Sequence, residues 1–282
     1  MRFEIVTDVG CDLPQSVYKK WDITVAKMPV TLNGKTTYPD SREETKALYN
    51  ALRRGETAVT AAIAPEAWKN VMRPILEKGQ DVLVLAFSSG LSTTANCAEI
   101  ARQELAEEFP ERKIRVVDTL CASMGQGLLV YYACKERSAG KSLDETADWC
   151  EENKLRINHW FTVEDLKYLR RGGRISGAAA LAGTLLNIKP VMNTQDDGKL
   201  HPVTKVRGRK AALAALAEKV CASAVENEVV FISHGDCPED AKLLAKQISH
   251  KCGKVVTGEI GAVIGSHSGP GTVAVFFLDA HR

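Results

Sequence analysis

Three hydroxyl side chains, those of Ser88, Ser89 and Ser92, follow the apolar run from Val82 to Phe87. The run predicts a buried strand, and the residues from Ser92 onward predict a helix, so the serines lie in the turn between them. Free backbone N–H groups and the positive end of the helix dipole favour an anion at such a turn. Helix capping and a serine nucleophile are the alternatives. The nucleophile is disfavoured because only the second glycine of the G-x-S-x-G elbow, Gly90, is there.

His267 is the histidine in the most suggestive setting. It lies between Ile264 and Gly271, a stretch so rich in glycine and serine that it predicts a loop. Binding residues often lie on such loops, so we expect the imidazole to face a ligand. A surface histidine in a flexible loop is the alternative.

Cationic side chains gather in the second half of the chain. Arg170 and Arg171 end a predicted helix, Arg174 follows the Gly172-Gly173 stop, and Arg207 belongs to a second basic segment. Solvated helix faces often have this composition. Arg174, however, lies just past the helix stop, where its guanidinium can reach an anion or an acidic partner.

The composition excludes several classes of protein. The chain has 282 residues with 45% hydrophobic and 26% charged side chains, which is typical of a globular protein of two domains. A formal net charge of +2 gives no general basis for binding nucleic acid or an acidic membrane. The eight cysteines are scattered without the spacing of a metal site, and no cofactor motif is present. No apolar run approaches the roughly 18 residues of a membrane span, so we expect a cytoplasmic protein without stable membrane insertion.

The elements that position these residues change character along the chain. In the first half, strands alternate with helices, which predicts a parallel, Rossmann-like α/β domain at residues 1–156. Asn33-Gly34, between predicted strands at 23–32 and 35–38, predicts a hairpin, and capping boxes are predicted at Ser41 with Glu44 and at Ser142 with Glu145. In the second half, a hairpin turn at 196–198 and further strands and helices predict an α+β domain with a mixed sheet at residues 157–282. A helix of small residues from Ala178 to Leu186 could line an apolar tunnel, and plain packing is the alternative.

These motifs, in this order, resemble the DegV family of fatty-acid-binding proteins. The matching segments span the chain: Ile5–Asp8 with Asp12–Pro14, Ser88–Ser92, Leu166–Ser176, Leu186–Pro190, Lys205–Gly208, and Ile264–His267 with Gly269–Gly271.

The resemblance implies a two-domain protein that encloses a long-chain fatty acid between its domains. It implies that Thr60, Ser88, Ser89, Arg174 and His267 surround the carboxylate. It further implies a non-catalytic carrier that presents this carboxylate to a separate ATP-dependent fatty acid kinase subunit, which makes acyl phosphate for phospholipid synthesis.

The same resemblance implies that Arg170, Arg171 and Arg207 face the kinase. Two positions depart from the family pattern. Ala61-Ala62-Ile63 replaces a hydroxyl, an amide and a proline after Thr60, and Ala95 stands where an aromatic residue is common.

Two enzymes are the rival hypotheses. One is a serine hydrolase that acts on a lipid or acyl ester through Ser89, with His267 as the base. The other is a small-molecule kinase, which is disfavoured because the chain has no G-x-x-x-x-G-K-[ST] loop.

Overall fold

The structure is a computed structural model that describes residues 3–175 and 187–282. The predicted helix from Ala178 to Leu186 lies outside the described residues. The first half of the chain forms the predicted parallel sheet, sheet A, whose strand order is β2 (Ile23–Ala26), β1 (Phe3–Asp8), β6 (Asp81–Ala86) and β7 (Ile114–Asp118).

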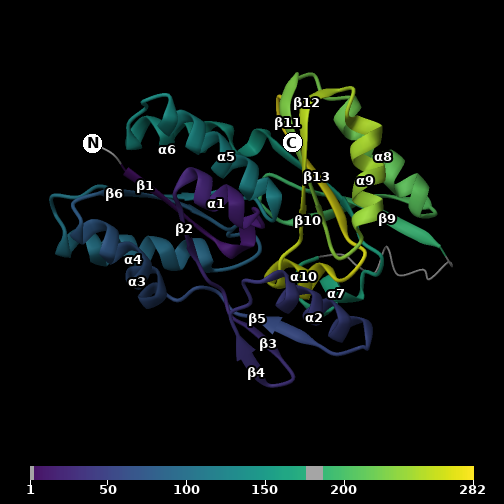
Figure 1. Ribbon diagram of the computed structural model, residues 1–282, viewed down its shortest axis with the longest axis horizontal. Helices are drawn as coiled ribbons and strands as arrows, with labels where there is room; N and C mark the ends of the chain where they lie inside the picture. Colours follow the sequence, from purple (N-terminus) through teal and green to yellow (C-terminus); the bar gives the residue numbers. More distant parts are fainter. Residues whose placement is uncertain (1–2, 176–186) are drawn as a thin grey trace.

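Helices cover both faces of sheet A (Figure 1). They are α1 (Gln15–Trp21), α3 (Pro65–Glu77), α4 (Thr94–Glu108), α5 (Met124–Ser138) and α6 (Leu143–Asn153). All six side chains of β6 are buried, as the unbroken apolar run predicts for a central parallel strand. The carboxyl ends of the strands therefore meet at one edge, where β6 leads into the serine turn.

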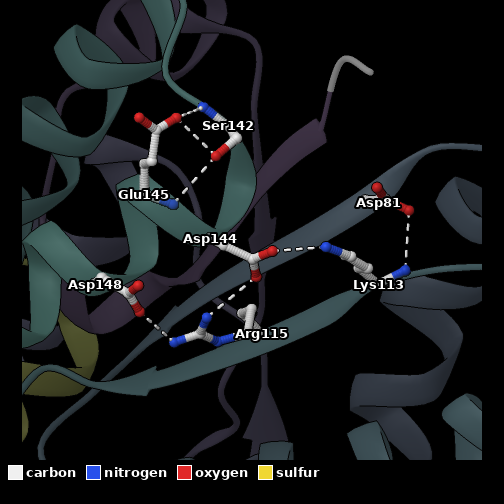
Figure 2. Close-up of polar contacts among 7 residues, drawn as sticks. All are labelled: Asp81, Lys113, Arg115, Ser142, Asp144, Glu145 and Asp148. Carbon is white, nitrogen blue, oxygen red and sulfur yellow. Dashed lines mark hydrogen bonds and ion pairs between the residues drawn. The ribbon is translucent and has the colours of Figure 1, made fainter.

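A polar network fixes α6 beside β7 (Figure 2). Ser142 and Glu145 form the predicted capping box at the start of the helix. Asp144, in the first turn, accepts hydrogen bonds from Lys113 at 2.6 Å and from Arg115 at 3.1 Å. These pairs are largely exposed, so they orient the helix more than they stabilise it.

The second half forms a mixed sheet, sheet C, which confirms the predicted α+β character. Its strand order is β10 (Leu200–Arg207), β9 (Ile188–Thr194), β8 (Ile157–Thr162), β13 (Val273–Leu278), β11 (Asn227–His234) and β12 (Cys252–Glu259). Helices α8 (Arg209–Cys221) and α9 (Pro238–Ile248) cover one face, and α5 packs against the other. Because α5 contacts both sheets, one cluster of buried side chains joins them. The division at residue 156 stays a prediction.

A third, antiparallel sheet holds β4 (Lys35–Thr37), β3 (Val30–Leu32) and β5 (Ala58–Thr60). The predicted hairpin at Asn33-Gly34 is confirmed, with both residues at positive φ. The prediction of one strand from Ile23 to Leu32 is wrong, because the chain leaves sheet A after Ala26 and enters the small sheet at Val30. Strand β5 was not predicted in its small-residue segment.

Three helices pack together beside this small sheet, near the bottom of Figure 1: α2 (Arg42–Arg53), α7 (Lys167–Arg171) and α10 (Ala262–Ser268). Helix α10 corrects the predicted loop around His267. Its glycine has a packing reason, since a Cβ on Gly265 would lie 2.6 Å from the Tyr49 hydroxyl on α2. The Ser266 hydroxyl donates to the Ala262 carbonyl within the helix at 2.7 Å. The glycines and serines thus permit close helix packing.

Candidate functional site

A cavity lies between the carboxyl edge of sheet A and the inner face of sheet C. Most of its lining is apolar and comes from segments far apart in the sequence. The apolar members are Met28, Ala61, Ala62, Phe87, Leu91, Ala122, Phe161, Leu169, Leu200, Ile260, Val263, Ile264, Ala274 and Phe276. Such a lining suits a hydrocarbon group, since each buried methylene yields about 0.8 kcal/mol.

Polar side chains gather at one end of the cavity. Thr60, on β5, and His267, on α10, line it together, and Thr60 Oγ1 lies 2.7 Å from His267 Nε2. Arg174 lines the same cavity, just after α7. Three of the predicted carboxylate contacts are therefore close together, although they come from three separate elements.

Backbone carbonyls hold the Arg174 side chain in place. Its Nε donates to the Leu91 carbonyl at 3.1 Å, and its Nη1 donates to the carbonyl of Gly172. Gly172 also explains how α7 approaches α10, because a Cβ on this residue would lie 2.2 Å from His267 Nδ1. The glycine thus lets the chain carry Arg174 past the imidazole.

His267 is neutral at neutral pH. Burial, and next the charge of Arg174, lower its pKa from 6.5 to about 4. Within residues 3–175 and 187–282, its Nδ1 and the hydroxyl of Ser268 are buried without a hydrogen-bond partner. Buried polar atoms are normally paired, so this end of the cavity suits a ligand that brings hydrogen-bonding atoms.

Ser88 and Ser89 lie at the predicted turn but do not line the cavity. The Ser88 hydroxyl is buried and donates to the Gly198 carbonyl at 2.9 Å, in the turn between β9 and β10. Ser89 is exposed, and its backbone N–H donates to Asp118 at 3.1 Å. Their part in carboxylate binding stays a prediction.

Ser92 is the serine of this turn that lines the cavity. Its hydroxyl lies 2.8 Å from that of Thr94, the first residue of α4. The sequence singled out Ser92 only as a capping candidate. Its place two residues before the first helical residue was the available signal, because side chains there lie beside the free N–H groups.

The departures from the family pattern shape the mouth of the cavity. Ala61 and Ala62 line it, and Ala61 is exposed. Ile63 is buried, with its N–H donating to the Thr94 hydroxyl at 3.4 Å, and Ala95 is 5% exposed. The segment after Thr60 therefore adds small apolar groups to the mouth.

The three arginines expected at a partner surface are all exposed. Arg171 donates to the Thr57 hydroxyl at 2.8 Å, on the loop that leads into β5. The guanidinium groups of Arg170 and Arg207 form no hydrogen bond or ion pair with any residue that the structure describes. Both guanidinium groups are available to an acidic surface.

The geometry does not favour the serine hydrolase. His267 Nε2 is paired with Thr60 Oγ1, and Ser89 lies outside the lining. A general base works best with a pKa near the working pH, and a pKa of about 4 makes His267 a weak one.

No group of three or more His, Cys, Asp or Glu side chains among the described residues could hold a metal ion. No helix in that part of the chain has the length and apolar character to cross a membrane.

Comparison with known proteins gives matches along the whole chain. A sequence profile of the DegV family, described as uncharacterised proteins, matches residues 2–280. A DegV domain-containing protein of Clostridium perfringens is 43% identical, covering 98% of this chain and 97% of the relative.

Solved structures match equally fully. A DegV family protein from Thermus thermophilus, whose structure is described as fatty acid binding, has a TM-score of 0.90 at 31% identity, covering 99% of this chain and 100% of the other. A DegV lipid-binding protein from Thermotoga maritima has a TM-score of 0.88 at 29% identity, with 100% of both chains covered. With a family profile and a relative of this similarity along almost its full length, the chain belongs to the DegV family.

Proposed function

We propose that this protein binds a long-chain fatty acid, with the acyl chain in the apolar cavity and the carboxylate beside Thr60, Arg174 and His267. The observation that carries the proposal is the cavity itself, which is apolar along its lining and ends at a cluster of buried polar groups. The fatty acid and lipid binding described for the Thermus and Thermotoga relatives supports it.

The two ends of the ligand contribute differently to the free energy of binding. Burying about sixteen carbons offers on the order of 10 kcal/mol before ordering costs. A buried carboxylate is costly unless donors meet it. The Arg174 guanidinium, the Thr60 and Ser92 hydroxyls and a neutral His267 are suitable donors, whereas Ser88 and Ser89 hold the turn that carries Ser92. The hydrocarbon thus supplies affinity and the polar end supplies orientation.

A direct test is lipid extraction of the purified protein followed by mass spectrometry, with hexadecanoic acid binding measured on delipidated protein. We expect bound or exchangeable fatty acid. Absence of both across common chain lengths would contradict the proposal.

We also propose that the protein presents the carboxylate to a separate ATP-dependent kinase subunit, which forms acyl phosphate. The exposed Arg170, Arg171 and Arg207 would contact that subunit, and the polar end of the cavity lies close to α7, which carries two of them. In this scheme the protein is a carrier and performs no chemistry of its own.

The charge reversal Arg207→Glu tests the docking role. We expect unchanged binding of hexadecanoic acid and loss of acyl phosphate formation with a cognate kinase. Lys254→Glu, an exposed charge reversal on β12, is the matched control. Unchanged turnover by Arg207→Glu would refute the docking role and leave fatty acid binding standing.

A further inference from the structure

The cavity extends away from His267 along β13. This strand begins beside α10, where the Thr272 hydroxyl donates to the Ser268 carbonyl at 2.9 Å (Figure 1). Alternate residues Thr272, Ala274 and Phe276 all line the cavity. Alternate side chains share one face of a strand, which rises about 3.3 Å per residue, so this wall extends about 13 Å from the polar end.

A second histidine, His159, lies at the far end of that wall. Strand β8 runs antiparallel to β13 and places Phe161 opposite Ala274 and His159 opposite Phe276. The His159 and Phe276 rings meet edge to face, with centroids 5.3 Å apart. Both His159 and Phe161 line the cavity, so its two walls reach the imidazole at the same level.

The polar atoms of His159 and Ser123 are engaged within the protein, whereas the hydroxyl of Thr194, on the neighbouring strand β9, also lines this end and has no hydrogen-bond partner among the residues that the structure describes. His159 Nδ1 lies 2.9 Å from the Ile157 carbonyl and donates to it, and Nε2 accepts from the Ala122 N–H at 3.3 Å. The Ser123 hydroxyl donates to Asp12 at 2.6 Å. Burial lowers the pKa of His159 well below 6.5, so the ring stays neutral. The imidazole therefore presents carbon to the cavity.

Helix α5 also fixes the imidazole, on the side of the ring next to Gly125. A Cβ on Gly125, in the first turn of α5, would lie 2.1 Å from His159 Nε2. The ring is 3% exposed and rests directly on the backbone of α5. It cannot retreat from a longer ligand without disturbing that helix.

We propose that His159 is the stop that sets the longest acyl chain the cavity accepts. This inference rests on the proposed fatty acid binding. A longer chain would have to displace the imidazole from α5.

Two substitutions test the stop in opposite directions. His159→Ala removes the ring and lengthens the cavity, whereas Gly125→Ala pushes the ring into it. The probes are dodecanoic, hexadecanoic and eicosanoic acids, bound to delipidated protein and measured by calorimetry. His250→Ala, an exposed histidine after α9, is the matched control.

We expect the ratio of the affinities for eicosanoic and dodecanoic acids to be roughly tenfold higher in His159→Ala than in the parent, because the variant can bury about two further methylenes. Gly125→Ala should shift the preference toward dodecanoic acid. If the alanine variant does not fold, His159→Asn takes its place. The asparagine keeps a donor to the Ile157 carbonyl and should shift the preference in the same direction, to a smaller extent.

Failure of the proposed stop and failure of the proposed fatty acid binding would give different results. If the parent binds these acids but neither His159 variant changes the order of affinities, the stop is refuted and fatty acid binding stands. No binding of any acid by the parent would overturn the proposed function and this inference with it.

Discussion

His267 and His159 line the same cavity, and burial lowers the pKa of both, yet their ring nitrogens have different surroundings. Both nitrogens of His159 are hydrogen-bonded to backbone groups. His267 uses Nε2 with Thr60, and its Nδ1 has no partner in the parts of the chain that the structure describes. The first ring acts as an apolar wall, and the second offers polar atoms to a ligand.

Residue type alone therefore does not define a binding group. An arginine lies near each ring, Arg174 by His267 and Arg282 by His159. The two ends differ in whether local backbone groups satisfy the hydrogen-bonding atoms of the imidazole.

The largest expected effect is at the polar end. Arg174→Ala should weaken hexadecanoic acid binding by about 100-fold, because a hydrogen bond to a charged group contributes about 1.5–3 kcal/mol. Calorimetry on delipidated protein measures the loss. Arg170→Ala, an exposed arginine on the neighbouring helix, should leave affinity unchanged. Equal losses in both variants would remove Arg174 from the carboxylate site.

His267→Ala should weaken binding by about tenfold, the value of one hydrogen bond to a charged ligand near the lower end of its range. The loss should be the same for dodecanoic and eicosanoic acids, because the carboxylate is common to both. A loss that depends on chain length would place His267 along the hydrocarbon and erase the difference from His159.

The two rings should also titrate differently when ligand binds. In the free protein, the pKa of His267 is about 4, below its ordinary 6.5, so its contribution to stability is complete above about pH 6.5 and is lost as the pH falls toward 4. A bound carboxylate favours the protonated form of His267 and should raise its pKa by about one unit. His159, far from the carboxylate, should stay unprotonated with and without ligand. Histidine NMR titration measures both, and a parallel shift in the two rings would contradict the assignment.

The smallest expected effect distinguishes two serines of one turn. Ser88→Ala should lower the free energy of unfolding by about 1 kcal/mol, because the Gly198 carbonyl and the Gly90 N–H lose their hydroxyl partner. Hexadecanoic acid affinity should not change. Ser92→Ala should do the reverse and weaken affinity a few-fold. Urea unfolding and calorimetry measure the two effects. A drop in affinity for Ser88→Ala alone would support Ser88, as the sequence predicts, as the carboxylate contact in place of Ser92.

Much of the fold followed from local signals in the sequence. The capping boxes at Ser41 and Ser142 and the Asn33-Gly34 hairpin are all confirmed, because each depends on residues within a few positions of one another. The predicted parallel and mixed sheets are confirmed as well. The stretch around His267 is a helix and not the predicted loop. Gly265 is needed there because the Tyr49 side chain, more than 200 residues away in the sequence, packs against it.

Most of the elements, the family motifs and the hydroxyl, guanidinium and imidazole groups suited to an anion could be predicted from the sequence. Which of these groups face the cavity depends on the tertiary structure. It turned Ser88 toward Gly198 and Ser92 toward the lining, paired Thr60 with His267, and satisfied His159 with the backbone. The reason is physical: hydrogen-bond satisfaction depends on neighbours that folding brings together, and no local pattern encodes those neighbours.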